Sequence, residues 1–212
     1  MDKYNKSNKL SNHMKVIILL ATIIVLLSYL YFNISVEASK YEKYIDKSIN
    51  EKMRFIKTGL NDTEKLLEQI IENKKITKAN VNEIIERYRE FSINYNELAL
   101  LYKRLNDSNF ESTAKDINLN IYYYFYQYLN KRAYDAGDKG YELTENEHQV
   151  LIKIKELISD YKDIIQNNEN YILKGNYLSS NNDVWKKIVK EMEQVIEKSK
   201  YETLGYETFY YD

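Results

Sequence analysis

The strongest pattern along the chain is an uninterrupted apolar run from Val16 to Phe32. It contains no charged side chain, and Thr22 and Ser28 are its only weakly polar members. At 1.5 Å per residue the run forms roughly 26 Å of helix, and its extension to Val36 reaches about 31 Å, the thickness of the hydrocarbon core of a bilayer. The pattern therefore predicts a transmembrane helix over residues 15–36, with lipid as its direct partner.

The charged residues that flank this run predict its orientation. Four lysines and one aspartate precede it, whereas residues 33–43 carry two glutamates and two lysines. Because an excess of Lys and Arg favours the cytoplasmic side, we expect residues 1–14 to form a cytoplasmic polar tail. Everything after residue 36 is then expected to be extracytoplasmic, on a protein of the cell membrane with a single span.

A cleaved signal peptide is the main alternative to this signal anchor. The sequence Val36-Glu37-Ala38 offers small residues before a cleavage point at Ser39. The apolar run is longer than the 7–15 residues typical of a signal peptide, which favours retention. Cleavage after Ala38 would make the protein secreted. A buried core helix is a third reading, although such helices seldom run this far without a charge.

Apolar residues after the membrane segment recur at spacings of three and four, which is typical of amphipathic helices. The first such stripe runs from Ile45 to Leu60, and Asn61-Asp62 is expected to end that helix before a short one over 63–74. The next stripe alternates three and four over eight positions, and a capping box of Asn80 and Glu83 is expected at its start. Its members are Val81, Ile84, Tyr88, Phe91, Tyr95, Leu98, Tyr102 and Leu105.

Three further helices are expected before residue 200. The first follows a Ser108–Glu111 capping box, has a stripe over 110–128 and ends at the loop 135–140. The second follows a Thr144–Glu147 box and has a wide stripe over 150–172, and the last spans about 183–200 around Trp185. Short loops between long helices favour antiparallel neighbours. The sequence thus predicts an all-α chain: an antiparallel up-down bundle of about four to six helices over 37–200, followed by an aromatic tail over 201–212.

Composition supports this fold and limits the partners. The chain has no proline and only five glycines among 212 residues, so turns and strand breaks are scarce. It has no cysteine, which excludes disulfides and thiolate metal sites. The net charge is −1, and the lysines before residue 16 leave the remainder weakly acidic, which argues against nucleic acid as a partner. Abundant Lys, Asn, Ile and Tyr indicate an A+T-rich genome, which we expect to be bacterial.

Tyrosine is unusually frequent, with 22 copies, and clusters in the segment 122–128. On a helix of 100° per residue, Tyr124, Phe125 and Tyr128 fall on the core stripe, while Tyr123 and Tyr126 point to the opposite side. In one interpretation the rings simply replace leucine in the core and place their hydroxyls at its edge. In the other, Tyr123 and Tyr126 form an exposed contact patch for a protein or glycan partner.

No pattern for catalysis or metal binding stands out. Read as a calcium loop from Asp135, the sequence has Gly137 and Lys139 at two ligand positions and Asn146 where a glutamate is required. His13 and His148 lie on opposite sides of the membrane segment and are not expected to share a site. Because metalloprotease, P-loop and nucleophile-elbow motifs are missing from the sequence, we expect a protein that is not an enzyme and that carries no cofactor or metal.

Two classes of function remain. The first is a membrane-anchored interaction or sensory module whose helical bundle contacts another envelope protein. It is architecturally similar to the extracytoplasmic four-helix sensory domains of bacterial receptors, although no motif carries the similarity. The second is a structural or assembly protein that forms homo-oligomers through its heptad helix. A secreted helical effector is the outcome if the chain is cleaved after Ala38.

Overall fold

The computed structural model describes residues 12–106, 108–172, 178–180, 183–197 and 204. Almost all of the predicted tail over 201–212, and residues 1–11, lie outside this part of the chain. The chain divides into two compact units, Met1–Tyr44 and Ile45–Asp212. Each unit is described separately below, and helix α1, Asn12–Asn73, contributes to both.

The described portion of the first unit is helical and exposed throughout. Every side chain from His13 to Tyr44 is exposed, including the large apolar side chains of the run predicted to enter a bilayer. A window of 18 residues in α1 reaches a mean hydropathy of 2.4, and none of that window is buried. By length and composition, α1 can therefore cross a membrane.

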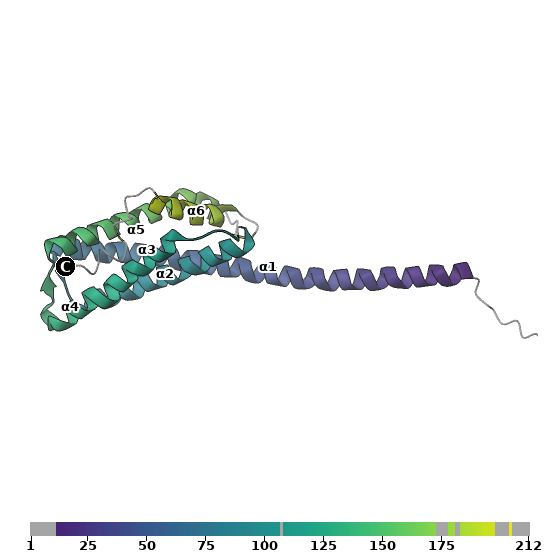
Figure 1. Cartoon of the computed structure of the whole chain (residues 1–212), viewed down its shortest axis with the longest axis horizontal. Helices are drawn as coiled ribbons and strands as arrows, with labels where there is room; N and C mark the ends of the chain where they lie inside the picture. The colour runs from purple at the N-terminus through teal and green to yellow at the C-terminus, as the bar shows by residue number, and fades with distance from the viewer. Residues whose placement is uncertain (1–11, 107, 173–177, 181–182, 198–203, 205–212) are drawn as a thin grey trace, which may run out of the picture. The chain divides into compact units, whose positions relative to one another are not determined.

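The second unit is a helical bundle, which confirms the predicted all-α class (Figure 1). Its helices are the remainder of α1, then α2 (Lys78–Leu105), α3 (Thr113–Tyr123), the π-helix η1 (Tyr124–Leu129), α4 (Asn130–Asp135), the 3₁₀ helix η2 (Gly137–Lys139), α5 (Glu145–Ile172) and α6 (Asp183–Glu197). Helices α3, η1 and α4 follow one another without a gap. These three segments therefore form one continuous helical stretch over residues 113–135.

Ion pairs between helices show the direction of packing. Lys52 of α1 contacts Glu97 of α2, and Asp62 lies 3.7 Å from Arg87, so residue numbers increase in opposite directions along these two helices. On the other side, Lys155 of α5 lies 2.9 Å from Glu68 of α1. A second α1–α5 pair, Glu64 with Lys162, again runs in opposite directions. Helix α1 is thus antiparallel to both α2 and α5, as the short loops indicate for α1 and α2.

A short strand pair, which the sequence pattern did not predict, joins two loops of the bundle. Strand β1 (Lys75–Ile76) pairs antiparallel with β2 (Tyr141–Glu142), with Ile76 opposite Tyr141. Gly140 makes this pairing possible, because its φ is +65° and a Cβ there would lie 2.3 Å from the carbonyl oxygen of Ile76. The loop after α4 is therefore fastened to the loop after α1.

The predicted end of a helix at Asn61-Asp62 is wrong, because α1 continues through both residues to Asn73. Gly59, two residues before the predicted end, lies where α1 and α2 approach closely. A Cβ at Gly59 would lie 3.0 Å from the Arg87 carbonyl oxygen and 3.0 Å from the Phe91 Cβ. The helix continues because its next two turns are buried against the bundle, at Leu60, Thr63, Leu66, Leu67 and Ile70.

Two of the three predicted capping boxes are misplaced, and one is confirmed. Helix α2 starts after Thr77, whose side chain forms a capping box with Asn80, one turn before the predicted Asn80–Glu83 box. Strand β1 decides this, because it holds the chain extended up to Ile76. The Thr144–Glu147 box is present as predicted, with the Thr144 backbone N–H donating to Glu147 Oε2 at 2.8 Å.

Helix α3 starts after Ser112 instead of following the predicted Ser108–Glu111 box. Phe110 explains the shift, because its ring meets that of Tyr102 at 4.7 Å and keeps the chain extended alongside α2. Ser112 is the first suitable cap after this contact, and its hydroxyl accepts from the backbone N–H of Lys115 at 3.0 Å.

The core agrees with the predicted stripes. The heptad stripe of α2 is buried from Val81 to Tyr102, and only its last member, Leu105, is exposed. Helix α5 buries the side chains of its stripe from Leu151 to Ile165, and α6 buries Trp185 completely. Large aromatic rings fill the centre of the bundle: Tyr88, Phe91, Tyr95, Phe125, Tyr161 and Trp185 are all fully buried.

Candidate functional site

The two tyrosines singled out as a contact patch lie at the junction of α3 and η1. Tyr123 is the last residue of α3 and is half-buried, whereas Tyr126 lies in η1 and is 51% exposed. Tyr122 connects them: its ring is stacked on that of Tyr126 at 5.8 Å and meets that of Tyr123 at the same centroid distance. We call Tyr122, Tyr123 and Tyr126 the surface tyrosine cluster.

The π-helical turn explains why this segment presents rings on both sides. In η1 the backbone N–H of Asn130 donates to the carbonyl of Phe125, five residues earlier. The wider turn places the adjacent rings of Tyr124 and Phe125 in the core together. Phe125 packs edge-on against Tyr88 at 5.4 Å, and Tyr124 stacks on Tyr128 at 5.3 Å. Isolated π-turns occur frequently at functional sites, which makes this junction a candidate surface.

Tyr122 is the member of the cluster that sequence reasoning missed. A fixed rotation of 100° per residue places it beside the core stripe, and its ring is partly buried against the core, so its contact with Tyr126 was not predicted. Its spacing of four residues from Tyr126 was nonetheless a usable signal, because residues i and i+4 of a helix are neighbours on its surface.

A buried carboxylate, Glu147, organises the loop region around β2. Arg132 Nη1 lies 2.5 Å from Glu147 Oε1, the Tyr141 hydroxyl donates to the same oxygen at 3.3 Å, and Thr144 donates to the other oxygen. Burial and the negative charge of Glu147 raise the pKa of the Tyr141 hydroxyl. Because its acceptors are engaged, Glu147 fastens α4, β2 and α5 together and offers no free base for catalysis.

A second buried carboxylate, Glu193 of α6, joins three helices. It accepts hydrogen bonds from the Tyr95 hydroxyl of α2, from Ser112 Oγ at 2.5 Å and from the backbone N–H of Ala114 at 3.0 Å. The last two donors belong to the N-terminal turn of α3, where a negative charge is favourable. Burial, with the nearby charge of Glu193, raises the pKa of Tyr95 well above its usual value. This arrangement is a structural junction.

The residues considered for metal binding are not gathered into a site. Within the described ranges, no group of three or more His, Asp or Glu side chains could hold a metal ion. Nε2 of His148 lies 3.3 Å from the carbonyl oxygen of Ile71, at the end of α1. The loop tested as a calcium site instead contains η2 and strand β2.

Comparisons of this chain with protein-family models, with curated proteins and with solved structures found no match.

Proposed function

We propose that this chain is a single-pass membrane protein whose helical bundle serves as a non-enzymatic interaction or sensory module outside the cytoplasm, in the cell envelope. The observation that carries the proposal is the continuous exposed apolar surface of α1. Large apolar side chains from Met14 to Val36 are exposed, with no protein surface covering them in the part of the chain that the structure describes. A soluble protein seldom presents apolar surface of this extent, whereas lipid covers it without cost.

The lysines before residue 16 support the orientation, with the N-terminus in the cytoplasm and the bundle outside. The bundle itself has a filled aromatic core, and its buried carboxylates are engaged in structural hydrogen bonds. These features suit a folded module that presents a surface. For that surface we propose the tyrosine cluster, because exposed tyrosine is enriched at protein interfaces.

The assembly alternative has weaker support. In that reading the heptad stripe of α2 would bind a second copy of the chain. The side chains from Val81 to Tyr102 are already buried inside the bundle, so the stripe becomes available only if the bundle opens. An oligomer would have to use another surface.

The topology is tested by protease treatment of intact cells that express the chain with a different epitope tag at each end. We expect loss of the C-terminal tag and survival of the N-terminal one. Survival of the C-terminal tag in sealed cells, with loss after lysis, would exclude an outside bundle. N-terminal sequencing of the mature protein is the companion measurement, because a start at Ser39 would show cleavage and exclude the anchor.

The contact surface is tested by photo-crosslinking in intact cells. A photoreactive phenylalanine analogue at Tyr126 should capture a partner, whereas the same analogue at Tyr134, which is 67% exposed in α4, should not. Changing Tyr123 and Tyr126 to serine should weaken capture of the same partner when the photoreactive analogue stands at position 122. The thermal midpoint of unfolding should stay nearly unchanged. Equal capture from positions 126 and 134, or a large drop in the midpoint, would contradict the contact role.

A further inference from the structure

The exposed apolar side chains of the bundle are confined to a few of its helices. In the second unit, the large apolar residues that are exposed belong to α2, η1 and α4: Ile93, Leu100, Leu105, Tyr126 and Tyr134. The described residues of α5 and α6, and those of α1 from Ile45 onward, contribute none. Because apolar residues that need no partner are usually scattered singly over a protein surface, this uneven distribution indicates that another molecule covers the α2 side.

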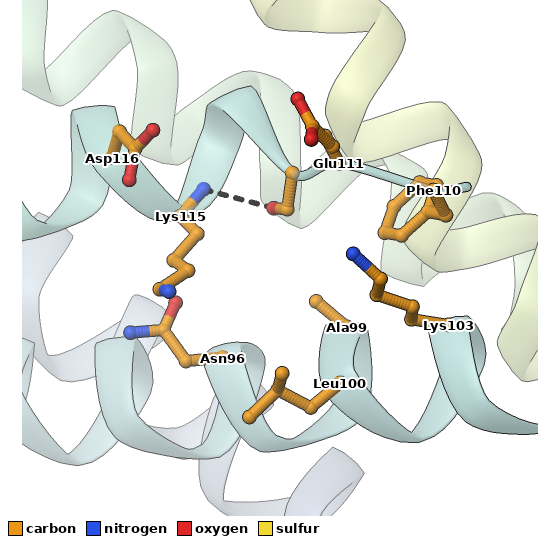
Figure 2. Close-up of a pocket in the computed structure, with 9 residues that line it drawn as sticks. Asn96, Ala99, Leu100, Lys103, Phe110, Glu111, Lys115 and Asp116 are labelled. Carbon is orange, nitrogen blue, oxygen red and sulfur yellow. Dashed lines mark hydrogen bonds between the residues drawn. The ribbon is translucent and has the colours of Figure 1, made fainter. Parts of the chain in front are cut away.

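Two of these residues lie beside α3. Helices α2 and α3 are neighbours, since the Tyr88 hydroxyl donates to Asn118 at 3.0 Å. Ile93 and Leu100 are 44% and 46% exposed and lie seven residues apart, which places them on the same side of α2. A cleft of about 220 Å³ separates Leu100 from the start of α3 (Figure 2). We call Ile93, Leu100 and the surface tyrosine cluster the α2–α3 face.

The charged side chains around the cleft are of both signs. Figure 2 shows Lys103 on the α2 side, with Lys115, Glu111 and Asp116 at the start of α3. None of these four forms an ion pair with another residue in the described part of the chain. A mixture of this kind does not favour a ligand of one charge. It suits a two-fold interface, where one patch meets its own copy and each lysine can face a carboxylate.

Beyond the cleft, the segment that carries the surface tyrosine cluster has no charge at all. Residues 117–130 contain no Asp, Glu, Lys or Arg, in a chain of which 30% is charged. Like charges that meet across an interface are costly, and a two-fold axis brings each residue near its own copy. A segment without charge can therefore approach a second copy of itself without repulsion.

The size of the face is comparable to that of a dimer interface. The helical stretch from Thr113 to Asp135 is roughly 34 Å long, and two adjacent helices are roughly 20 Å wide, which gives roughly 700 Å². Each partner in a stable complex buries about 800 Å². We propose that two copies of this chain in one membrane pack against each other through their α2–α3 faces as a two-fold symmetric dimer.

This inference names the partner of the surface in the proposed function and rests on it, because a single-pass anchor places all bundles on the same side of one membrane. Confinement to that membrane raises the effective concentration of one copy near another. The heptad stripe of α2 stays buried in such a dimer, which uses the outer side of the helix instead.

Cysteine cross-linking tests the dimer in membranes that contain the full-length chain. The chain has no cysteine, so a single introduced cysteine reports only on its own surroundings. A short bismaleimide should join two copies through Tyr126→Cys and through Leu100→Cys. Asn167→Cys, at an exposed position of α5, is the matched control. It should give about tenfold less dimer, because undocked copies meet only by random encounter.

A charge exchange tests whether the partner is a second copy. Lys103→Glu with Lys115→Glu leaves only carboxylates in this set around the cleft. Glu111→Lys with Asp116→Lys leaves only lysines. In the Tyr126→Cys background, each double variant alone should form about tenfold less dimer, because like charges then face each other. Expressed together, the two should form a mixed dimer at close to the yield of Tyr126→Cys alone, since opposite charges now meet.

Restoration requires both double variants to be folded, and no partner other than a copy of the chain can produce it. The fluorescence of Trp185, the single tryptophan and fully buried, verifies the fold of each variant. If a charge variant does not fold, the cysteine comparison decides.

The dimer is excluded if Tyr126→Cys and Leu100→Cys cross-link no better than Asn167→Cys, or if two folded charge variants fail to restore each other. Capture of a different protein from position 126, in place of a second copy, would also exclude it and would leave the tyrosine contact of the proposed function standing. A bundle on the cytoplasmic side would overturn the topology and leave this measurement intact, because all copies would still share one side of the membrane.

Discussion

Glu193 shows how one residue on a late helix can decide where an earlier one begins. Its carboxylate accepts hydrogen bonds from Ser112 and from the backbone of Ala114, and so satisfies donors in the first turn of α3. The same group accepts from the Tyr95 hydroxyl in the core. Because hydrogen bonds to a charged acceptor are about twice as strong as neutral ones, this residue links α2, α3 and α6 more firmly than an amide would.

The prediction at this scale is a loss of stability in Glu193→Gln. The amide keeps the volume but loses the charge, and one of its polar atoms becomes a donor facing other donors. We expect a decrease in the free energy of unfolding of about 1–3 kcal/mol, measured by urea titration with Trp185 fluorescence. Gln194→Ala, at the exposed neighbouring position, should change it by less than about 0.5 kcal/mol. Equal effects of the two substitutions would show that the junction does not form.

Among the elements, α1 is the one whose course depends on its neighbours. Local signals at Gly59, Asn61 and Asp62 favour an end, yet the helix continues. Burial of the following two turns stabilises the helix by more than these residues disfavour it. Gly59 then acts through its missing side chain, since it lets α1 approach the backbone of α2 at Arg87 and Phe91.

Gly59→Ala is the test of that close approach. Alanine favours a helix over glycine by about 1 kcal/mol, so an open position would be stabilised. Here the added methyl meets a backbone carbonyl and a Cβ at 3.0 Å, neither of which can rotate away. We expect overpacking to prevail and the free energy of unfolding to fall by about 1 kcal/mol or more. Thr58→Ala, at an exposed position one residue earlier, is the control, and a gain in stability for Gly59→Ala would show looser packing.

At the scale of the whole bundle, buried tyrosine hydroxyls make stability depend on alkaline pH. Burial raises the pKa of Tyr88 and Tyr95 well above the ordinary value of 10.0, and the pKa values of Tyr124 and Tyr141 are raised as well. These groups remain protonated in the folded state at a pH where the unfolded chain ionises them. The folded state therefore binds more protons above pH 10, and its stability falls as pH rises.

We expect the free energy of unfolding to be insensitive to these tyrosines below about pH 9 and to fall steeply above pH 10, by about 1.4 kcal/mol per pH unit for each buried tyrosine. Circular dichroism during urea titration at several pH values measures this. Tyr88→Phe should reduce the pH slope of the unfolding free energy by the contribution of one tyrosine. The substitution also removes the 3.0 Å hydrogen bond that the Tyr88 hydroxyl donates to Asn118. Tyr126→Phe, at an exposed position, should leave the slope unchanged.

Much of this architecture follows from periodicity alone. Spacings of three and four identified the core faces of α2, α5 and α6, because burial of an apolar stripe is the main source of helix stability in a bundle. The apolar run of α1 was equally clear, since a stretch of that length without charge has few alternatives. The outward positions of Tyr123 and Tyr126 also came from helical geometry, but their role as a contact surface stays a prediction.

Contacts between distant residues decided the rest. The strand pair at Ile76 and Tyr141 set the start of α2, and the Phe110–Tyr102 contact set the start of α3. At Gly59 the close approach of α2 shows that the glycine permits helix packing and does not end the helix. The π-turn arose where two adjacent rings were buried together. The cleft exists only because α2 and the start of α3 come together around Asn96. Local pattern determines which residues favour burial, whereas the partner surface determines where each helix begins and ends and what it leaves uncovered.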